Sequence, residues 1–434
     1  MNTSTHFIIN AGGQLHGTYR VPGDKSISHR AIMLGAIAEG ITQISGFLEG
    51  EDTLATMSAF RALGVTIEGP VQGQVAIHGV GKWGLRPPKT PLYLGNSGTS
   101  MRLLAGLCAG QKFTVELQGD ESLSKRPMRR IIEPLTLMGA HISGNHQNTP
   151  PLTIHGNPNL QGIHYTLPVA SAQVKSCVLL AGLYAQGTTC VVEPTPTRDH
   201  TERMLQGFNY PLQREKQQIY LTSAHALRAT TIEVPADISS ATFFIIGATI
   251  APGSDILLEH VGINPTRTGV IEILQQMGAD ITLLNYREIG YEPVVDIRVR
   301  YSPLHGIHIP SALVPLAIDE FPALFIAAAC AQGETVLKDA EELRVKESDR
   351  IQVMAEGLQI LGIRAQPTAD GLIIQGGTFQ GGVINSHGDH RVAMAFAMAA
   401  LQAENTLVIE NCANVATSFP NFIDLTRQAG LKFQ

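Results

Sequence analysis

Charged residues are scarce in this sequence, and long apolar runs are absent. Only 16% of the 434 residues are charged and the net charge is −6, so the balance does not favour a nucleic-acid-binding surface. The longest apolar stretches, such as 243–251, are too short to cross a bilayer. Residues 1–20 lack the basic start, apolar core and cleavage site of a signal peptide. We therefore expect a cytoplasmic protein with neither nucleic acid nor membrane as a partner.

Cysteine is also scarce, and its spacing argues against disulfides and metal sites. The five cysteines show no CxxC pair, and HExxH is absent. Cys108, Cys177 and Cys330 lie in apolar stretches and are expected to be buried, reduced thiols. The sequence thus predicts no metal site. Its length exceeds that of one ordinary core, so two domains are expected.

A short apolar helix followed by a small-residue turn recurs along the chain. Its turn contains Gly40, Gly110, Gly187, Gly253 and Gly333, with a weaker sixth copy at Asn405. We expect these residues to adopt the left-handed conformation that commonly ends helices. A strand-like stretch and a second helix follow each turn, so each copy is predicted to be β-α-β-α-β-(β). The fold class is therefore α/β, built from six repeats.

The starts of the six first helices are polar and suited to capping. They are Asp24–Arg30, Asn96–Arg102, Ser171–Lys175, Asp237–Ser240, Asp319–Pro322 and Asp389–Arg391. Four of them carry Lys or Arg in the first turn or two, where the helix dipole disfavours a cation. A bound anion would compensate for that cost. The repetition favours a pocket for a highly anionic ligand over capped helices that merely enter a core.

Two loops add further charged residues. In Gly119–Met128, Arg126 precedes Pro127, a residue type favoured at the first position of a helix. In Arg344–Ile351, the spacing of Lys346, Glu347 and Arg350 is that of one helix face. An exposed Glu347–Arg350 ion pair is the plainer interpretation of that second group.

Taken in order, these motifs resemble those of the EPSP synthase family, the 3-phosphoshikimate 1-carboxyvinyltransferases. The resemblance covers nearly the whole chain and also includes Thr417–Asn421. It implies two similar domains, each of three β-α-β-α-β-β repeats, in an inside-out α/β barrel of the enolpyruvyl transferase type. The expected domains are residues 22–235 and residues 1–21 plus 236–434, with the active site in the cleft between them.

The resemblance also implies a reaction. The enolpyruvyl group of phosphoenolpyruvate moves to the 5-hydroxyl of shikimate 3-phosphate and phosphate is released, without a cofactor and in a monomer. Both substrates carry a phosphate and a carboxylate, which arginine binds through forked, charge-assisted hydrogen bonds.

The same resemblance assigns site residues. Residues expected to bind shikimate 3-phosphate are Lys25, Ser26, Arg30, Ser171, Ala172, Gln173, Arg198, Asp319 and Lys346. Those expected to bind phosphoenolpyruvate are Lys25, Asn96, Gly98, Arg126, Gln173, Arg350 and Arg391. Asp319 is the expected base; a helix cap is the plainer interpretation of this residue and is compatible with that role. Glu347 is the expected proton donor, with Lys25 as a rival.

Three positions depart from the family pattern. Ala172 stands where many relatives have serine, and Thr417 stands where others have a lysine near phosphoenolpyruvate. Gly98 stands where several relatives have alanine, and the space it leaves predicts sensitivity to the herbicide glyphosate.

Two alternatives remain open from the sequence. UDP-N-acetylglucosamine enolpyruvyl transferases share the fold and the donor, but they usually carry a cysteine in the loop that here is Gly119–Pro127 and contains none. The basic Ser171–Lys175 motif favours a phosphorylated acceptor. A non-catalytic repeat protein that binds anions is the second alternative, and the presence of Asp319 and Glu347 among the cations argues against it.

Overall fold

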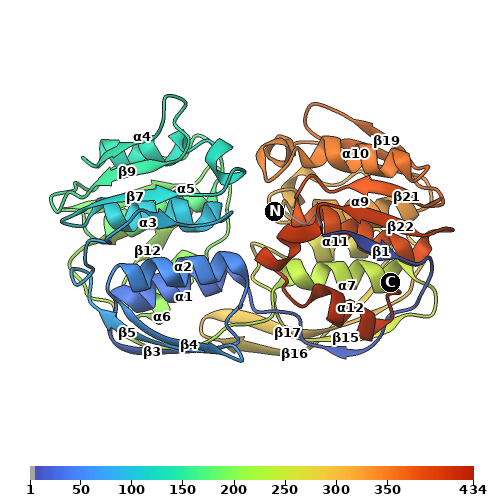
Figure 1. The fold of residues 1–434 in the computed structure, drawn as a ribbon, viewed down its shortest axis with the longest axis horizontal. Helices are drawn as coiled ribbons and strands as arrows, with labels where there is room; N and C mark the ends of the chain where they lie inside the picture. The colour runs from blue at the N-terminus through green and yellow to red at the C-terminus, as the bar shows by residue number, and fades with distance from the viewer. Residues whose placement is uncertain (1–4) are drawn as a thin grey trace. The chain divides into compact units, whose positions relative to one another are not determined.

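The computed structural model describes residues 5–434, which form two compact units (Figure 1). The first unit comprises Gly23–Val234 and Ile289–Tyr291. The second comprises the chain up to Pro22, Pro235–Glu288 and Glu292–Gln434. Each unit has its own hydrophobic core of buried side chains. No helix in the described part of the chain has the length and hydropathy needed to span a membrane.

Three four-stranded sheets enclose the first unit. Their strand orders are β14-β3-β5-β4, β6-β7-β9-β8 and β10-β11-β13-β12. The strands are β3 (Glu39–Ser45), β4 (Thr66–Val71), β5 (Gln74–Val80), β6 (Leu92–Tyr93), β7 (Thr114–Gln118), β8 (His141–Ser143), β9 (Leu152–His155), β10 (His164–Thr166), β11 (Thr188–Val192), β12 (Gln213–Glu215), β13 (Gln218–Thr222) and β14 (Thr231–Glu233).

The second unit follows the same plan with three further sheets. Their orders are β16-β17-β15-β2, β18-β20-β19 and β1-β22-β21. The strands are β1 (Phe7–Ile9), β2 (His16–Tyr19), β15 (Asp255–Gly262), β16 (Asp280–Ile289), β17 (Glu292–Arg300), β18 (Glu334–Leu337), β19 (Arg364–Pro367), β20 (Leu372–Gln375), β21 (Gly382–Asn385) and β22 (Leu407–Glu410). The N-terminal strands β1 and β2 pair with β22 and β15.

The predicted repeat is present in the sheets. In the first unit the strand after each first helix, β3, β7 or β11, pairs with one antiparallel and one parallel neighbour. In the second unit β15 does the same with β17 and β2. The exception in the second unit is β18, which among the strands of residues 5–434 pairs with β20 alone. The six-fold α/β architecture expected from the sequence is therefore confirmed.

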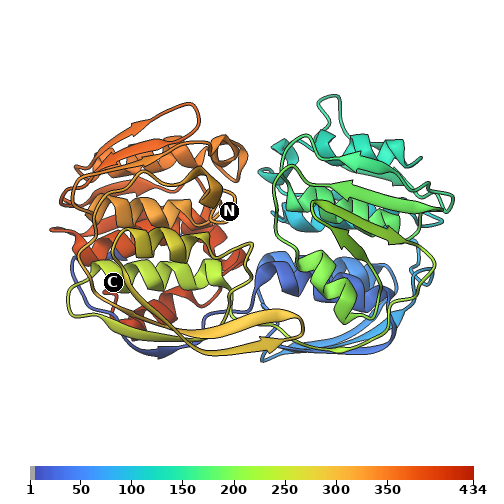
Figure 2. The same ribbon diagram turned by 180° about the vertical axis from the view of Figure 1, so that it is seen from behind.

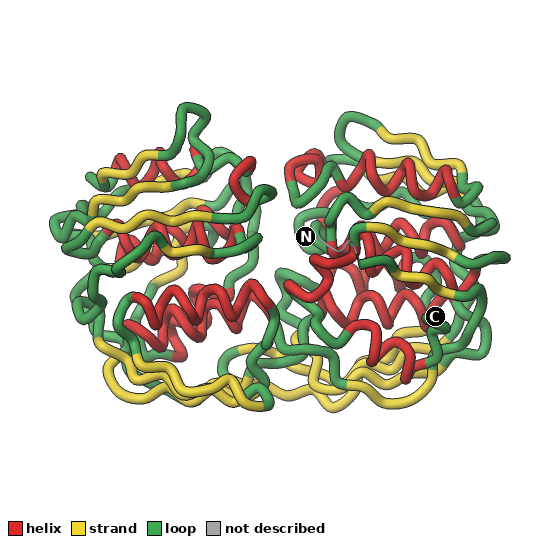
Figure 3. The backbone as a smooth tube through the Cα atoms, in the orientation of Figure 1, coloured by secondary structure: helices red, strands yellow, loops and turns green. Residues whose placement is uncertain are grey.

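Within each unit the helices pack between the sheets (Figures 2 and 3), the first helices at the centre and the second helices with one face partly exposed. The first helices are α1 (Lys25–Ile37), α3 (Gly98–Ala109), α5 (Ala172–Gly182), α7 (Ile238–Ile250), α9 (Phe321–Cys330) and α11 (His390–Ala399). The second helices are α2 (Glu51–Ala62), α4 (Arg129–Leu137), α6 (His200–Gly207), α8 (Gly269–Gln276), α10 (Arg350–Ile360) and α12 (Phe422–Ala429). In the second unit α7, α9 and α11 pack on one another, and every residue of α7 is buried. A helix that is apolar on all sides requires such a position.

Five of the six first helices are capped by a side chain as the sequence predicts. The capping residues are Asp24, Ser97, Ser171, Asp237 and Asp389, each of which accepts a hydrogen bond from a backbone N–H of the first turn. Of the two candidates before α3, the cap is Ser97 and not Asn96. The exception is α9, where Glu320 holds the cap position without a side-chain hydrogen bond. Asp319 therefore does not cap this helix, and the plainer interpretation of this residue as a cap is wrong.

The turn glycines follow the prediction with one exception. Gly40, Gly187, Gly253 and Gly333 have positive φ angles, whereas Gly110 has φ −86°. Gly110 is constrained by space instead, because a Cβ there would lie 2.4 Å from the ring of Tyr184. Of the three cysteines expected to be buried, Cys108 and Cys177 are buried, whereas Cys330 is only partly buried.

The close packing of α3 on α5 depends on Gly106. A Cβ at this position would lie 2.2 Å from the carbonyl oxygen of Cys177, which is rigid backbone. We predict that Gly106→Ala lowers the free energy of unfolding by about 1–3 kcal/mol in urea denaturation, because the two helices must move apart. Gly207→Ala is the control: its Cβ would meet only ordinary contacts at 3.6 Å. Equal stabilities of the two variants would contradict this role of Gly106.

Candidate active site

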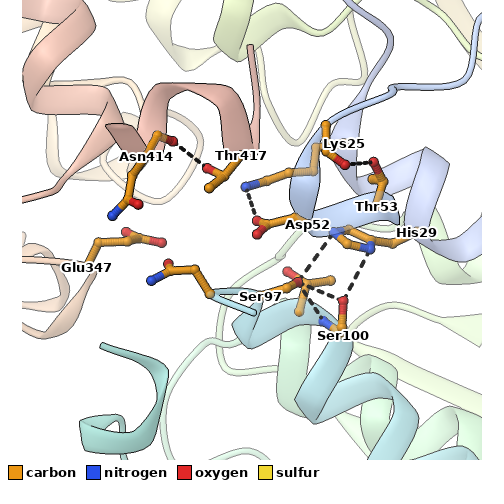
Figure 4. A network of polar contacts seen from close by, with 12 residues as sticks. Lys25, His29, Asp52, Thr53, Ser97, Ser100, Glu347, Asn414 and Thr417 are labelled. Carbon is orange, nitrogen blue, oxygen red and sulfur yellow. Dashed lines mark hydrogen bonds and ion pairs between the residues drawn. The ribbon is translucent and has the colours of Figure 1, made fainter. Parts of the chain in front are cut away.

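Lys25 lies at the start of α1 and is paired with a carboxylate from α2. Its Nζ donates to Asp52 Oδ2 at 2.8 Å, and the lysine side chain is only 19% exposed (Figure 4). Lys25 is the first residue of α1, where the first backbone N–H groups of the helix have no partner within the helix. An anion bound here would contact both the lysine ammonium group and these N–H groups.

Asn96 and Arg126 form a second polar group beside the start of α3. Asn96 donates to Asp120 Oδ2 at 2.8 Å and accepts from Arg126 Nη2 at 2.7 Å. Gly98 is the first residue of α3, and a Cβ added there would lie 3.0 Å from Arg102 Nη1 and 3.2 Å from Arg126 Nη1. Two guanidinium groups thus border the space beside Gly98.

Gln173, in the first turn of α5, is held from both sides of its amide. Its Oε1 accepts from Arg102 Nη1, and its Nε2 donates to Thr99 Oγ1 at 3.0 Å. Arg102 therefore orients a predicted ligand-binding residue. Ser171 caps the helix through its side chain, and Ala172 is its first residue, so the backbone N–H of Ala172 has no partner within the helix.

Arg30 is buried one turn and a half into α1 and is oriented by two hydroxyl groups. Its Nε donates to Thr201 Oγ1 at 2.8 Å and its Nη2 donates to Ser176 Oγ at 2.9 Å. Its Nη1 donates to the carbonyl of Ser26 at 3.0 Å. These three hydrogen bonds fix the guanidinium plane of Arg30.

Arg198 is partly buried in the segment that joins β11 to α6.

Lys175 does not belong with the predicted ligand-binding cations. Its side chain is fully buried, and its Nζ lies 2.8 Å from both Glu193 Oε1 and Glu202 Oε1. The interpretation of Ser171–Lys175 as a basic ligand-facing motif is therefore wrong for its lysine. A buried ion triad of this kind ties α5 to β11 and α6.

Arg350 is the centre of the polar cluster in the second unit. Its side chain is 1% exposed, and its Nε donates to Asp389 Oδ2 at 2.8 Å. Its Nη2 donates to Glu347 Oε2 at 2.5 Å, and its Nη1 donates to Asp319 Oδ1 at 3.4 Å. Burial alone would lower the pKa of Arg350, but the charges of the three carboxylates raise it above its ordinary value. Arg350 also holds the pKa of the buried Asp389 below its ordinary value, against the effect of burial.

Asp319 lies where three cationic side chains converge. Its carboxylate is 3.7 Å from Lys346 Nζ and 3.4 Å from Arg350 Nη1, and its backbone carbonyl accepts from Arg391 Nη1 at 3.0 Å. The carboxylate stays partly accessible, at 16% exposure. The neighbouring Glu320 is buried and accepts a hydrogen bond from Ser239.

Lys346 and Glu347 are not on a helix face, contrary to the prediction from their spacing. A 3-10 turn ends at Val345, Lys346 has a non-helical backbone with φ −82° and ψ −147°, and α10 begins at Arg350. The reason is the cap of α10: Asp349 accepts from the backbone N–H of Gln352 at 3.0 Å. Likewise α4 begins at Arg129 and not at Pro127. Thr417, on the last 3-10 turn, donates to the carbonyl of Asn414 at 2.7 Å (Figure 4).

Several residues of these clusters carry no role in the sequence-based prediction. Asp52, Ser176 and Thr201 contact the predicted ligand-binding side chains directly. The only available signal was the acidic first turn of α2, since Glu51 and Asp52 follow Gly50. The hydroxyl groups of Ser176 and Thr201, within α5 and α6, give no comparable signal.

Each unit presents cations at or near helix starts, with a few carboxylates beside them. Lys25, Arg30 and Arg126 provide the positive charge in the first unit, and Lys346, Arg350 and Arg391 provide it in the second. Such groups can bind phosphates and carboxylates, while an accessible carboxylate such as Asp319 can accept a proton.

A buried histidine beneath Lys25 gives this site a measurable pH signature. His29 is fully buried, and its burial, followed by the charges of Lys25 and Arg30, lowers its pKa well below the ordinary 6.5. The unfolded chain therefore takes up a proton near pH 6.5 that the folded chain does not. Stability from this group is complete above pH 6.5 and declines as the pH falls below it.

We predict that His29→Asn flattens the dependence of unfolding free energy on pH below 6.5. The slope should fall by up to about 1.4 kcal/mol per pH unit, the value for one proton. Urea titrations at pH 7, 6 and 5 measure it, with the exposed-site variant His146→Asn as the control. Identical slopes for His29→Asn and the unchanged chain would contradict the neutral state of His29.

Comparison with known proteins agrees with the motifs. The family model for EPSP synthase (3-phosphoshikimate 1-carboxyvinyltransferase) matches residues 9–425. A 3-phosphoshikimate 1-carboxyvinyltransferase from Nitrosococcus oceani is 68% identical over 98% of this chain and 96% of its own length. One from Methylococcus capsulatus is 65% identical over 99% and 98%. The solved structure of EPSP synthase from Acinetobacter baumannii matches with a TM-score of 0.90 at 58% identity, covering 100% of this chain and 99% of that one. The chain belongs to the EPSP synthase (3-phosphoshikimate 1-carboxyvinyltransferase) family.

Proposed function

We propose that this chain transfers the enolpyruvyl group of phosphoenolpyruvate to the 5-hydroxyl of shikimate 3-phosphate and releases inorganic phosphate. The observation that carries the proposal is the set of cations at helix starts in both units, held in place by buried partners. Family membership supplies the identity of the two substrates. Both are multiply charged anions, which such helix starts are suited to bind.

The acceptor is bound chiefly through its phosphate and its ring hydroxyls. Arg30 is the best oriented cation for the phosphate, because Ser176 and Thr201 leave its guanidinium one orientation. Ser171, the backbone of Ala172 and Gln173 add hydrogen-bond donors at the start of α5. The remaining acceptor contacts come from Lys25, Ser26, Arg198, Asp319 and Lys346.

The donor is bound by the cations near the starts of α3, α10 and α11. Arg126 and the backbone at Gly98 lie beside each other, and Asn96 orients Arg126. Arg350 and Arg391 supply forked donors for the phosphate and carboxylate of phosphoenolpyruvate. Lys25 and Gln173 complete this set.

The chemistry needs a base and an acid, and the second unit offers both close to Arg350. Asp319 removes the proton of the 5-hydroxyl, whose oxygen then bonds to C2 of phosphoenolpyruvate. Glu347, or Lys25 in its place, gives a proton to the methylene carbon C3, and a tetrahedral intermediate forms. Loss of a proton from the new methyl group then re-forms the C=C bond and expels phosphate. Atoms and charge balance without a cofactor.

Phosphate release tests this function against its alternatives. Phosphoenolpyruvate is incubated with the protein and either shikimate 3-phosphate or UDP-N-acetylglucosamine. We expect release only with shikimate 3-phosphate. Release only with the nucleotide sugar would assign the chain to the sister activity, and no release with either would indicate an anion-binding protein without catalysis.

Asp319→Asn should separate binding from chemistry. The amide keeps the shape of the side chain but cannot accept the proton, so kcat should fall by about 10²–10⁴-fold. The dissociation constant for shikimate 3-phosphate, measured by calorimetry, should change by less than about threefold. Asp280→Asn, which alters a half-exposed carboxylate on β16, is the matched control. Full activity of Asp319→Asn would exclude it as the base.

Gly98→Ala should reduce both donor affinity and inhibition by glyphosate. The added Cβ would approach Arg102 and Arg126 to 3.0 and 3.2 Å, so the two guanidinium groups must shift by tenths of an ångström. We expect KM for phosphoenolpyruvate to rise by about two- to tenfold and the glyphosate inhibition constant to rise more. The unchanged chain should show inhibition competitive with phosphoenolpyruvate. Equal inhibition of the two proteins would contradict the position proposed for the donor.

A further inference from the structure

A buried polar network lies directly beneath the helix starts of the first unit. It consists of His29, Thr56, Ser97 and Ser100, all of them almost completely inaccessible to solvent. These residues come from α1, α2 and the start of α3, three helices that pack on one another. Figure 4 shows the His29 ring facing both Ser97 and Ser100, with the Lys25–Asp52 pair nearby.

Each member of the network is linked along its helix to a residue at the helix start. His29 lies one turn after Lys25 on α1, and Thr56 lies one turn after Asp52 on α2. Thr56 Oγ1 is also within 3.3 Å of the Asp52 carbonyl. Ser97 caps α3 directly before Gly98. The network thus joins the helix turns that carry Lys25, Asp52 and the Gly98 amide.

The hydrogen bonds of the network close into a ring. His29 Nδ1 lies 2.8 Å from Thr56 Oγ1, which lies 2.5 Å from Ser100 Oγ. Ser100 donates to Ser97 Oγ at 2.7 Å, and Ser97 lies 3.5 Å from His29 Nε2. If the imidazole carries its proton on Nδ1, each of the four groups donates once and accepts once around the ring.

The ring accommodates only a neutral imidazole. Ser97 Oγ already accepts from the Ser100 hydroxyl and from the Ser100 backbone N–H at 3.1 Å. A second ring proton on His29 Nε2 would point at this occupied oxygen. Lys25 and Arg30 add positive charge on the same helix, and Asp52, across on α2, is already paired with Lys25.

We propose that His29, together with Thr56, Ser97 and Ser100, is a positioning network that sets the spacing of Lys25, Asp52 and the Gly98 amide for binding phosphoenolpyruvate. This inference rests on the function proposed above. The network touches no substrate. It acts through the three helix starts, whereas Arg30 is held separately by Ser176 and Thr201. Its loss should therefore affect the donor more than the acceptor.

Steady-state kinetics with each substrate varied in turn test the proposal. His29→Leu removes both ring nitrogens, and KM for phosphoenolpyruvate should rise by about tenfold or more. KM for shikimate 3-phosphate should stay within about threefold. His29→Asn keeps a nitrogen near the position of Nδ1 and the bond to Thr56, so it should recover much of the donor affinity. Ser100→Ala, a smaller change in the same ring, should give an intermediate increase.

Two controls separate positioning from stability and from the proposed function. Ile37→Val alters the buried far end of α1 and should lower the melting temperature without changing either KM. Absence of turnover by the unchanged chain would refute the proposed function. A different outcome would overturn the positioning role alone. In it, the unchanged chain turns over both substrates, but His29→Leu and Ser100→Ala either raise both KM values equally or raise neither.

Discussion

A cation at the N-terminal end of a helix opposes the helix dipole, and the polar cluster of each unit depends on how this chain holds such cations there. Lys25, Arg350 and Arg391 each lie at such a start, and each contacts a carboxylate or a backbone carbonyl. These partners are themselves fixed, since Asp389 caps α11 and Ser348 donates to it at 3.0 Å. The positive charges are therefore already oriented before an anion binds, which reduces the ordering that binding requires.

The carboxylates that contact these cations differ in solvent exposure, and the exposure distinguishes a structural carboxylate from those that can take part in proton transfer. Asp389 is completely buried, where it orients the Arg350 guanidinium and caps α11, so its role is structural. Asp319 and Glu347 contact the same arginine but remain partly exposed. One arginine thus connects a structural carboxylate with the two carboxylates proposed to move protons. Lys175 shows the opposite outcome, because two buried glutamates surround it and remove it from the site.

The repeat, the strands after the first helices and most caps could be predicted because they depend on residues close in sequence. The side-chain partners could not. Asp52 is 27 residues from Lys25, and Thr201 is 171 residues from Arg30. Local spacing also misled where a cap intervened, as Asp349 stops Lys346 and Glu347 from joining α10. Lys175 could have faced solvent, but it faces two carboxylates. Side-chain packing between elements decides this, and the periodicity of the sequence contains no information about it.

The most direct test of enolpyruvyl transfer is a proton and phosphorus NMR spectrum of the reaction mixture. With phosphoenolpyruvate and shikimate 3-phosphate, the account predicts new vinyl signals of an enol ether at the 5-position, in equal amount to the inorganic phosphate formed. Phosphate accompanied by pyruvate and unchanged shikimate 3-phosphate would show hydrolysis in place of transfer, and would contradict the account.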